Sequence, residues 1–240
     1  MNAGVPEPAV RVFSSGGKAC RCHVFPGARA LLLQPSGAHE AEREDSEVLR
    51  IRRDAIVPFA MAFFDAGDWD AGLTPWEAPA AFGGRSFGSG ASRTLRSVLE
   101  SVLPDSLARA GLKDDVPVVL GGYSLAGLFA LWSIHQTDRF SAAAAVSPSV
   151  WYPGWTDYAD RNKPRTGIVY LSLGDREEKT KNRTLAAVGD AIRRQDGRLE
   201  ECGVRHVLRW NPGGHFSGAE ARCADGFVWC LEQLFSTPEE

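Results

Sequence analysis

The sequence has 240 residues, of which 44% are hydrophobic and 24% are charged. This composition is typical of a folded globular domain rather than of a disordered chain. The net charge of −3 is unlike that of nucleic-acid-binding proteins, which carry a basic excess or a basic stripe. No window approaches the roughly 20 apolar residues that a membrane span needs, and the first residues show no basic and apolar leader. We therefore expect one cytoplasmic domain over residues 1–240.

The five cysteines form no CxxC pair, so neither a disulfide framework nor a zinc ribbon is indicated. Cys20, Cys22 and His23 lie close together, but their spacing fits no structural zinc pattern and is typical of alternating residues on a strand. We expect no metal and no organic cofactor.

The N-terminal part of the chain predicts short strands, a charged helical stretch and then a long loop. The apolar runs that we interpret as strands are 10–13, 20–25, 30–34 and 56–64, with the charged stretch at 39–53. Pro58 weakens the start of the last run, because proline donates no hydrogen bond to a sheet. Residues 65–90 carry many glycines, prolines and aromatic residues. A loop of that length in a compact domain is uncommon unless it is functional, so we interpret it as one wall of a binding pocket.

The remaining two thirds alternate strands with helices. Expected helices are 92–110, interrupted at Pro104, then the segment that begins at Leu125, then 185–194 and 220–235. Expected strands are 118–122, 141–147, 167–173 and 204–210, and 148–164 is an aromatic loop. Such alternation predicts a three-layer α/β sandwich with a mainly parallel central sheet.

The stretch around Ser124 carries the clearest chemical signal. Residues 118–132 read VVLGGYSLAGLFALW, which is an apolar strand, a tight turn and an apolar helix. Gly122 and Ala126 flank the serine at two residues on either side, giving G-x-S-x-A, which differs by one methyl group from the G-x-S-x-G nucleophile elbow. The alternative is an ordinary βα turn with a serine that caps the helix.

A base and an acid follow this serine in the chain order of α/β-hydrolases, which is Ser, acid, His. His215 lies in the loop GGHF after the last strand and is the expected base, whereas His23, His39, His135 and His206 are expected to be structural or surface residues. The acid lies in LGDREE. We place Glu177 first and keep Asp175 and Glu178 as alternatives.

Four motifs together, GGYSLAGLFALW, SPSVWYP, SLGDREEKTKN and GGHF, resemble the putative-esterase family of the α/β-hydrolase superfamily, which includes siderophore esterases and S-formylglutathione hydrolases. The resemblance covers most of the chain after about residue 55. It implies an α/β-hydrolase fold and hydrolysis of acyl esters by Ser124, His215 and an acid near Glu177.

The expected mechanism passes through an acyl-enzyme, with the backbone N–H of Leu125 as one oxyanion donor. No HGGG-type segment is present, and we expect the second donor near Asp65, after the 56–64 strand. The short 148–164 insertion leaves little room for a lid.

Aromatic residues in the expected loops are candidates for binding the substrate. These are Trp69, Trp76, Trp151 and Tyr152, with at least one of Trp76 and Trp151 expected beside the Ser124 hydroxyl. The expected partner is a small-molecule ester, with no nucleic acid and no membrane. An acyltransferase on the same fold and a catalytically silent binding protein are the alternatives, and the natural ester and the oligomeric state stay open.

Overall fold

A mainly parallel sheet of eight strands organises the residues that the computed structural model describes, which are 7–37, 41–81 and 84–236. Its spatial order is β1-β2-β4-β3-β5-β6-β7-β8. β1 pairs antiparallel with β2, β2 pairs antiparallel with β4, and all other neighbours are parallel. The strands are β1 (Ala9–Ser15), β2 (Lys18–Val24), β3 (Leu31–Ser36), β4 (Ala60–Asp65), β5 (Val118–Tyr123), β6 (Ala142–Val146), β7 (Ile168–Gly174) and β8 (Arg205–Asn211).

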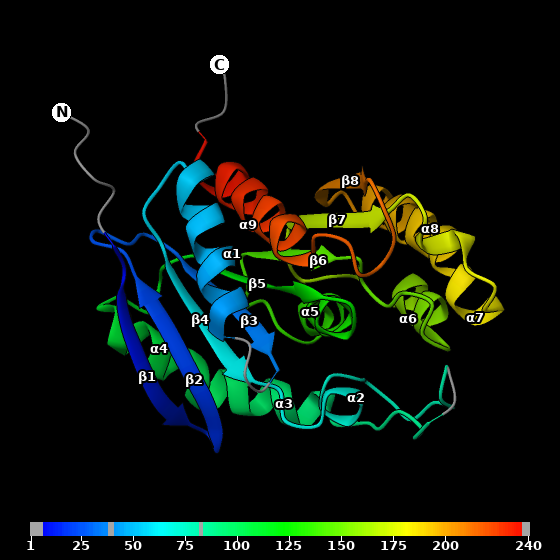
Figure 1. Ribbon diagram of the computed structural model, residues 1–240, viewed down its shortest axis with the longest axis horizontal. Coiled ribbons are helices and arrows are strands. Elements are labelled where there is room, and N and C mark those ends of the chain that lie inside the picture. The colour runs from blue at the N-terminus through cyan, green and yellow to red at the C-terminus, as the bar shows by residue number, and fades with distance from the viewer. Residues whose placement is uncertain (1–6, 38–40, 82–83, 237–240) are drawn as a thin grey trace.

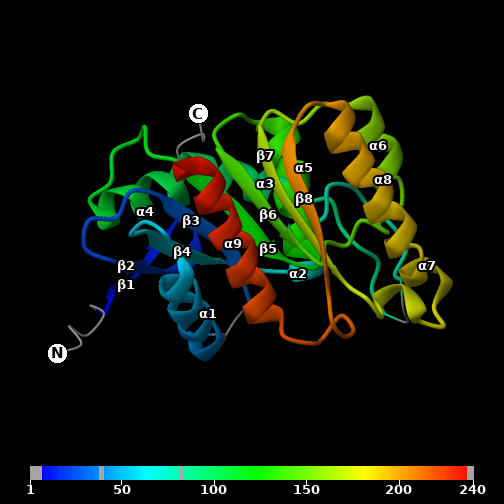
Figure 2. The same ribbon diagram turned by 90° about the horizontal axis from the view of Figure 1, so that it is seen from above.

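Helices cover both faces of this sheet, which confirms the predicted three-layer α/β architecture (Figures 1 and 2). One face carries α1 (Ala41–Asp54) and α9 (Ala219–Phe235), which lie side by side. The other face carries α3 (Ala91–Ser97), the π-helical turn η1 (Val98–Val102), α4 (Leu103–Ala110), α5 (Leu125–Gln136), α6 (Trp155–Arg161) and α8 (Val188–Glu201). The short helices α2 (Trp69–Gly72), η2 (Glu177–Lys179) and α7 (Arg183–Ala186) lie in connections.

Small residues at the centre of the sheet let the layers approach closely. β6 is AAAAV and is buried throughout. A Cβ atom added at Gly121 in β5 would lie 2.5 Å from the ring of Phe227 in α9, so the phenyl ring packs directly on the strand backbone. On the other face, α5 is apolar on all sides and buried from Leu125 to His135, as expected for a helix in the middle of a core. Ser124 therefore lies between two buried elements, β5 and α5.

Pro104 does not interrupt the helical segment where the sequence predicts a break. The π turn of η1 precedes it, and the Leu103 amide donates to the Val98 carbonyl five residues back. This wider turn shifts the hydrogen-bond register so that proline, which has no N–H, stands in the first turn of α4, where no such donor is required.

Two expected loops contain helices. Residues 148–164 include α6. Its first residue, Trp155, is fully buried and donates from Nε1 to Gln195 Oε1 of α8 at 3.0 Å, which packs this helix against α8. Residues 65–90 include α2 and a bridge between Ala78 and Phe87.

Some strand and helix ends also differ from the prediction. β4 begins only at Ala60, after Pro58, and the 185–194 helix is part of the longer segment α7 and α8. Of the residues singled out in the sequence, His39 lies outside the described residues.

Candidate active site

Ser124 occupies a sharp turn between β5 and α5. Its backbone has φ 58° and ψ −119°, a conformation that costs a non-glycine residue free energy and is typical of a nucleophile elbow. The neighbouring strand supports the turn, because the Ser124 amide donates to the Val146 carbonyl of β6 at 3.1 Å. A Cβ atom at Gly122 would lie only 2.5 Å from the Cβ of Ala126, so the glycine is required for the strand and helix to meet.

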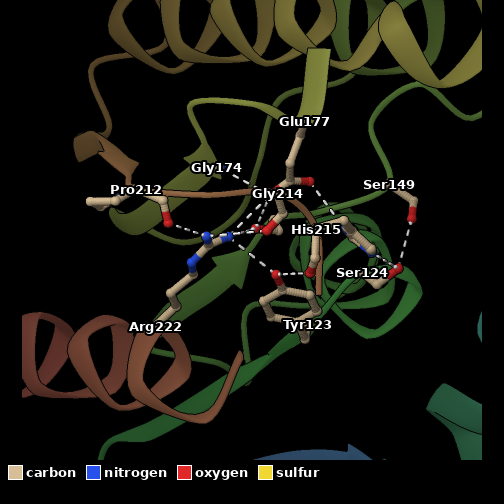
Figure 3. A network of polar contacts seen from close by, with 10 residues as sticks. Tyr123, Ser124, Ser149, Gly174, Glu177, Pro212, Gly214, His215 and Arg222 are labelled. Atoms are coloured by element: carbon tan, nitrogen blue, oxygen red, sulfur yellow. Dashed lines mark hydrogen bonds and ion pairs between the residues drawn. The ribbon is translucent and has the colours of Figure 1, made fainter. Parts of the chain in front are cut away.

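His215 lies beside Ser124, in the loop that follows β8. Its Nε2 is 3.0 Å from Ser124 Oγ, and its imidazole is partly exposed. The hydroxyl of Tyr123 donates to the His215 backbone carbonyl and holds this loop against the end of β5. The histidine expected from the GGHF motif thus lies within hydrogen-bond distance of the serine, as Figure 3 shows.

Glu177 completes a continuous chain of hydrogen bonds. It begins η2, just beyond the end of β7, and its Oε2 lies 2.7 Å from His215 Nδ1. Its other oxygen, Oε1, accepts from the Gly174 amide at 2.8 Å and from the Ser147 hydroxyl at 2.8 Å. Since the Glu177 side chain is only 4% exposed, these donors replace the water that the carboxylate loses.

Burial has the largest single effect on the pKa of Glu177 and raises it, but the hydrogen bond and charge of His215, with the bonds from Ser147 and Gly174, outweigh burial and leave the pKa below its ordinary value of 4.5. The site therefore favours the ionised carboxylate. An ionised group at Nδ1 fixes the tautomer in which Nε2 can accept the Ser124 proton.

The two alternative acids make other contacts. The carboxylate of Asp175 is exposed and accepts from the Gly213 amide at 2.8 Å. Glu178 forms a two-point ion pair with Arg193 of α8, at 3.0 and 3.2 Å. The structure brings Glu177, and neither of these neighbours, to His215.

Arg222 of α9 is a member of the site that sequence reasoning missed. Its side chain is 4% exposed and its Nη1 lies 3.1 Å from Glu177 Oε1. The same nitrogen donates to the Tyr123 and Ser147 hydroxyls, each at 3.2 Å. Figure 3 shows the guanidinium between the acid and the histidine loop. No motif marks this residue, because nothing local in the sequence distinguishes a buried arginine from an exposed one on a helix.

Arg222 also binds the segment that carries His215. Its Nη2 donates to the Pro212 carbonyl at 2.9 Å and to the Gly214 carbonyl at 3.3 Å. One guanidinium therefore contacts the acid and the backbone on the N-terminal side of the base, which couples their positions.

Two serines after β6 also belong to the site. Ser147 and Ser124 are the non-glycine residues with positive φ among those that the structure describes, and Ser147 has φ 41°. Ser149 has its hydroxyl 3.3 Å from Ser124 Oγ, and its amide donates to the Ser124 carbonyl. The SPS motif in the sequence could have marked these two serines as site residues, but the direction in which their side chains point depends on the fold.

Two cavities meet at Ser124, and two of the four predicted aromatic residues line them. Trp69 lines a cavity of about 170 Å³ that includes Ser124, and Trp151 lines one of about 260 Å³ that includes Ser124 and His215. Neither lining includes Trp76 or Tyr152. The Tyr152 hydroxyl donates to the Trp76 carbonyl, and Tyr152 is buried, so this pair fastens the loops together.

The strand that leads into the Ser124 turn, β5, is bordered by β3 and not by β4. Leu125 is the first residue of α5, and the first amides of a helix have no acceptor within it. Asp65, the other predicted donor, ends β4, which β3 separates from β5. Ser36, at the end of β3, lines the same cavity as Ser124. Sequence order does not reveal that β4 lies outside β3 and is therefore not a neighbour of β5.

Within the described ranges, no group of three or more His, Cys, Asp or Glu residues is placed to hold a metal ion. None of the helices in these ranges is long and apolar enough to cross a bilayer.

The fold and the arrangement at Ser124 are those of the α/β-hydrolases. Residues 34–215 match the family model described as "Putative esterase", and since this match covers most of the chain, the protein belongs to that esterase family. No curated protein matched the sequence.

Solved structures of esterases share the fold. The siderophore hydrolase EstB from Aspergillus nidulans has a TM-score of 0.72 and 16% identity, and the alignment covers 100% of both chains. The enterobactin esterase FES from Shigella flexneri has a TM-score of 0.68 and 17% identity, over 96% of this chain and 60% of that one. This chain thus spans about 60% of the Shigella protein. The esterase Pf2001 from Pyrococcus furiosus has a TM-score of 0.62 and 12% identity, with coverage of 95% and 92%.

Proposed function

We propose that this protein is a serine hydrolase that cleaves carboxylic esters of small molecules through an acyl-enzyme intermediate. The observation that carries the proposal is the unbroken chain of hydrogen bonds from Ser124 Oγ to His215 Nε2 at 3.0 Å and from His215 Nδ1 to Glu177 at 2.7 Å. Membership of an esterase family supports the same reaction.

In the first half of the proposed reaction, the Ser124 oxygen attacks the ester carbonyl carbon while His215 takes the hydroxyl proton. The resulting imidazolium is stabilised by Glu177, and it then donates that proton to the alcohol oxygen as the bond from carbon to the alcohol oxygen breaks. In the second half, water attacks the acyl-enzyme, His215 takes the proton of the water and returns it to Ser124, and the carboxylic acid leaves.

The negative charge on the carbonyl oxygen needs hydrogen-bond donors. The Leu125 amide is the first by elbow geometry. For the second we propose the connection after β3 in place of Asp65, since β3 is the direct neighbour of β5 and hydrolases of this fold take a donor from that connection. Such a donor lowers the barrier by roughly 3 kcal/mol.

One of the structural neighbours is named a siderophore hydrolase and another an enterobactin esterase. For this chain we propose the wider class of small-molecule esters. In the described part of the chain, the segment between β6 and β7 contains a single helix, the short α6. So small an insertion favours an open site over one covered by a lid.

Covalent labelling and turnover test the proposal together. A fluorophosphonate should label the wild-type protein at Ser124, and Ser124→Ala should remove both the label and the hydrolysis of p-nitrophenyl acetate, by at least about 10⁴-fold. Ser149→Ala is the matched control, since it removes the neighbouring hydroxyl and should keep the label.

Labelling of wild-type protein without turnover would identify an acyltransferase or another acceptor in place of water. Absence of labelling would identify a catalytically silent binding protein. Full turnover in Ser124→Ala would transfer the role of nucleophile to another residue, with Ser147 or Ser149 as the next candidates.

A further inference from the structure

The two cavities at Ser124 differ in one respect that matters for the reaction. Ser124 lines both, but among the described residues His215 lines only the larger one, of about 260 Å³. The smaller cavity instead continues over Tyr123 and the end of β3. An ester at Ser124 extends in two directions from its carbonyl carbon, so each cavity can hold one side of the substrate.

The proton transfer decides which side enters which cavity, provided that the proposed function holds. The alcohol oxygen leaves only when His215 Nε2 donates a proton to it, and that donation needs a distance of about 3 Å. The alcohol oxygen must therefore lie against the imidazole. The rest of the alcohol therefore occupies the larger cavity, which His215 lines, and the acyl group occupies the smaller cavity.

The larger cavity has walls that suit an apolar or aromatic body. Its apolar lining residues are Trp151, Leu185, Val188 and Phe216. Phe216 is 98% exposed, and the centre of its ring lies 5.3 Å from that of the His215 imidazole in an edge-on arrangement. A phenyl side chain left in solvent beside the expected base loses unfavourable contact with water when an apolar group covers it.

One cation lies among these lining residues. Arg176 follows β7, and its backbone amide donates to the Gly213 carbonyl at 3.2 Å, which fixes its position next to the histidine loop. Arg176 is one of the residues that line the cavity, and no carboxylate of the described residues lies within 4.0 Å of its guanidinium.

The neighbouring carboxylates have other partners. Glu177 is bound by His215 and Arg222, and Glu178 is paired with Arg193. An unpaired guanidinium beside an apolar cavity binds carboxylates with geometric preference, because its N–H groups match the two carboxylate oxygens.

We propose that the natural ester releases an alcohol or phenol that carries a carboxylate, and that Arg176 binds this carboxylate while the apolar body lies against Trp151 and Phe216. Arg176 is then a specificity residue for the leaving group. It does not act on the acyl side of the ester.

A pair of aryl esters tests this assignment. The substrates are 4-acetoxybenzoate, which carries the anion on the leaving group, and its uncharged methyl ester. In Arg176→Gln the ratio of kcat/KM for the anionic ester to kcat/KM for the neutral ester should fall by roughly three- to fivefold, the size expected for a partly exposed ion pair. Lys179→Gln is the matched control, because it removes a nearby positive charge from a residue outside the cavity lining and should leave the ratio unchanged.

A third substrate separates the two sides of the ester. Monophenyl succinate carries its anion on the acyl group, and its kcat/KM relative to that of phenyl acetate should not change in Arg176→Gln. The inhibition constant of the product 4-hydroxybenzoate should rise by the same factor as the ratio falls for its ester.

Equal effects of Arg176→Gln and Lys179→Gln would overturn the proposal and indicate that only the overall positive electrostatic potential of this segment matters. A loss confined to monophenyl succinate would reverse the assignment of the two cavities. If the wild-type protein hydrolyses neither the neutral nor the charged esters, the proposed function itself fails, whereas normal hydrolysis with an unchanged ratio defeats only the role of Arg176.

Discussion

At the scale of single residues, the site combines backbone strain with a buried charge. Ser124 and Ser147 both hold positive φ angles, and each positions a hydroxyl that contacts the hydrogen-bonded chain. Strain of this kind costs of the order of 1–3 kcal/mol per residue, and the paired, fully buried strands around it keep the conformation in place. The carboxylate of Glu177 is buried but has donors on both oxygens, so it remains charged without water.

Replacement of Glu177 tests its role as the orienting acid. Glu177→Gln should lower kcat by about 10³- to 10⁴-fold, because an amide neither fixes the same imidazole tautomer nor stabilises the imidazolium. Asp175→Asn and Glu178→Gln should stay near wild type in the same steady-state assay. A larger loss at either of these positions would mean that the acid is wrongly assigned.

The pH dependence of stability offers a second measurement on Glu177. Its pKa lies below the ordinary value of 4.5 in the folded protein, so the ionised form stabilises the fold above that value, and this contribution is lost as the pH falls through the lower folded pKa. Urea unfolding at about pH 6 and about pH 3.5 should therefore show a smaller loss of unfolding free energy in Glu177→Gln than in the wild type. Identical losses would indicate that other carboxylates account for the acid sensitivity.

At the scale of elements, the candidate site is assembled from three strand ends and one helix. β5, β7 and the segment after β8 supply the serine, the acid and the histidine, as expected for a sheet whose sites lie beyond the carboxyl ends of its strands. The helix is α9, which contributes Arg222 from the opposite face of the sheet to α5. α9 is thus more than a cover for the sheet, since it holds the acid and the histidine loop together.

Arg222→Met tests this connection. Breaking a buried ion pair by removing one partner costs about 3–5 kcal/mol, so we expect a loss of that order in the free energy of unfolding, together with a lower kcat. A positioning role further predicts that the effects of Arg222→Met and Glu177→Gln on kcat are strongly non-additive in the double variant. Additive effects would show that Arg222 contributes only to stability.

At the scale of the whole molecule, two tryptophans of one sequence segment, Trp151 and Trp155, lie in different environments. Trp151 lines the cavity with His215. Trp155, four residues later, is fully buried, with its indole N–H bound to Gln195 of α8 and its ring beside His135 of α5. Both tryptophans lie in the connection between β6 and β7, where Trp151 precedes α6 and Trp155 is its first residue.

This difference predicts opposite phenotypes. Trp155→Ala should lower the free energy of unfolding by about 3–5 kcal/mol, because it leaves a large cavity. Trp151→Ala should change stability by less than about 1 kcal/mol and should raise KM for phenyl acetate more than KM for ethyl acetate. Thermal unfolding and steady-state kinetics on the two variants check both statements, and a strongly destabilised Trp151→Ala would argue against a site wall.

The sequence by itself determined the class of fold, the turn at Ser124 and the order of serine, acid and histidine. These follow from local spacing, because strand and helix periodicity, small residues around a tight turn and short motifs after strands are all properties of adjacent residues. Even Pro104, which the sequence marked as a break, changed only one turn of the helical segment.

Only the tertiary structure decided which groups meet. The placement of β3 between β4 and β5 separates Asp65 from the strand that ends at the Ser124 turn, and it depends on a crossover that no local pattern encodes. Arg222 meets Glu177 across 45 residues of sequence, and Trp151 and Tyr152 are adjacent in sequence but separate into a cavity wall and a buried clamp. Contacts of this kind arise from packing between distant segments, where burial and the need to satisfy each polar group select the partner.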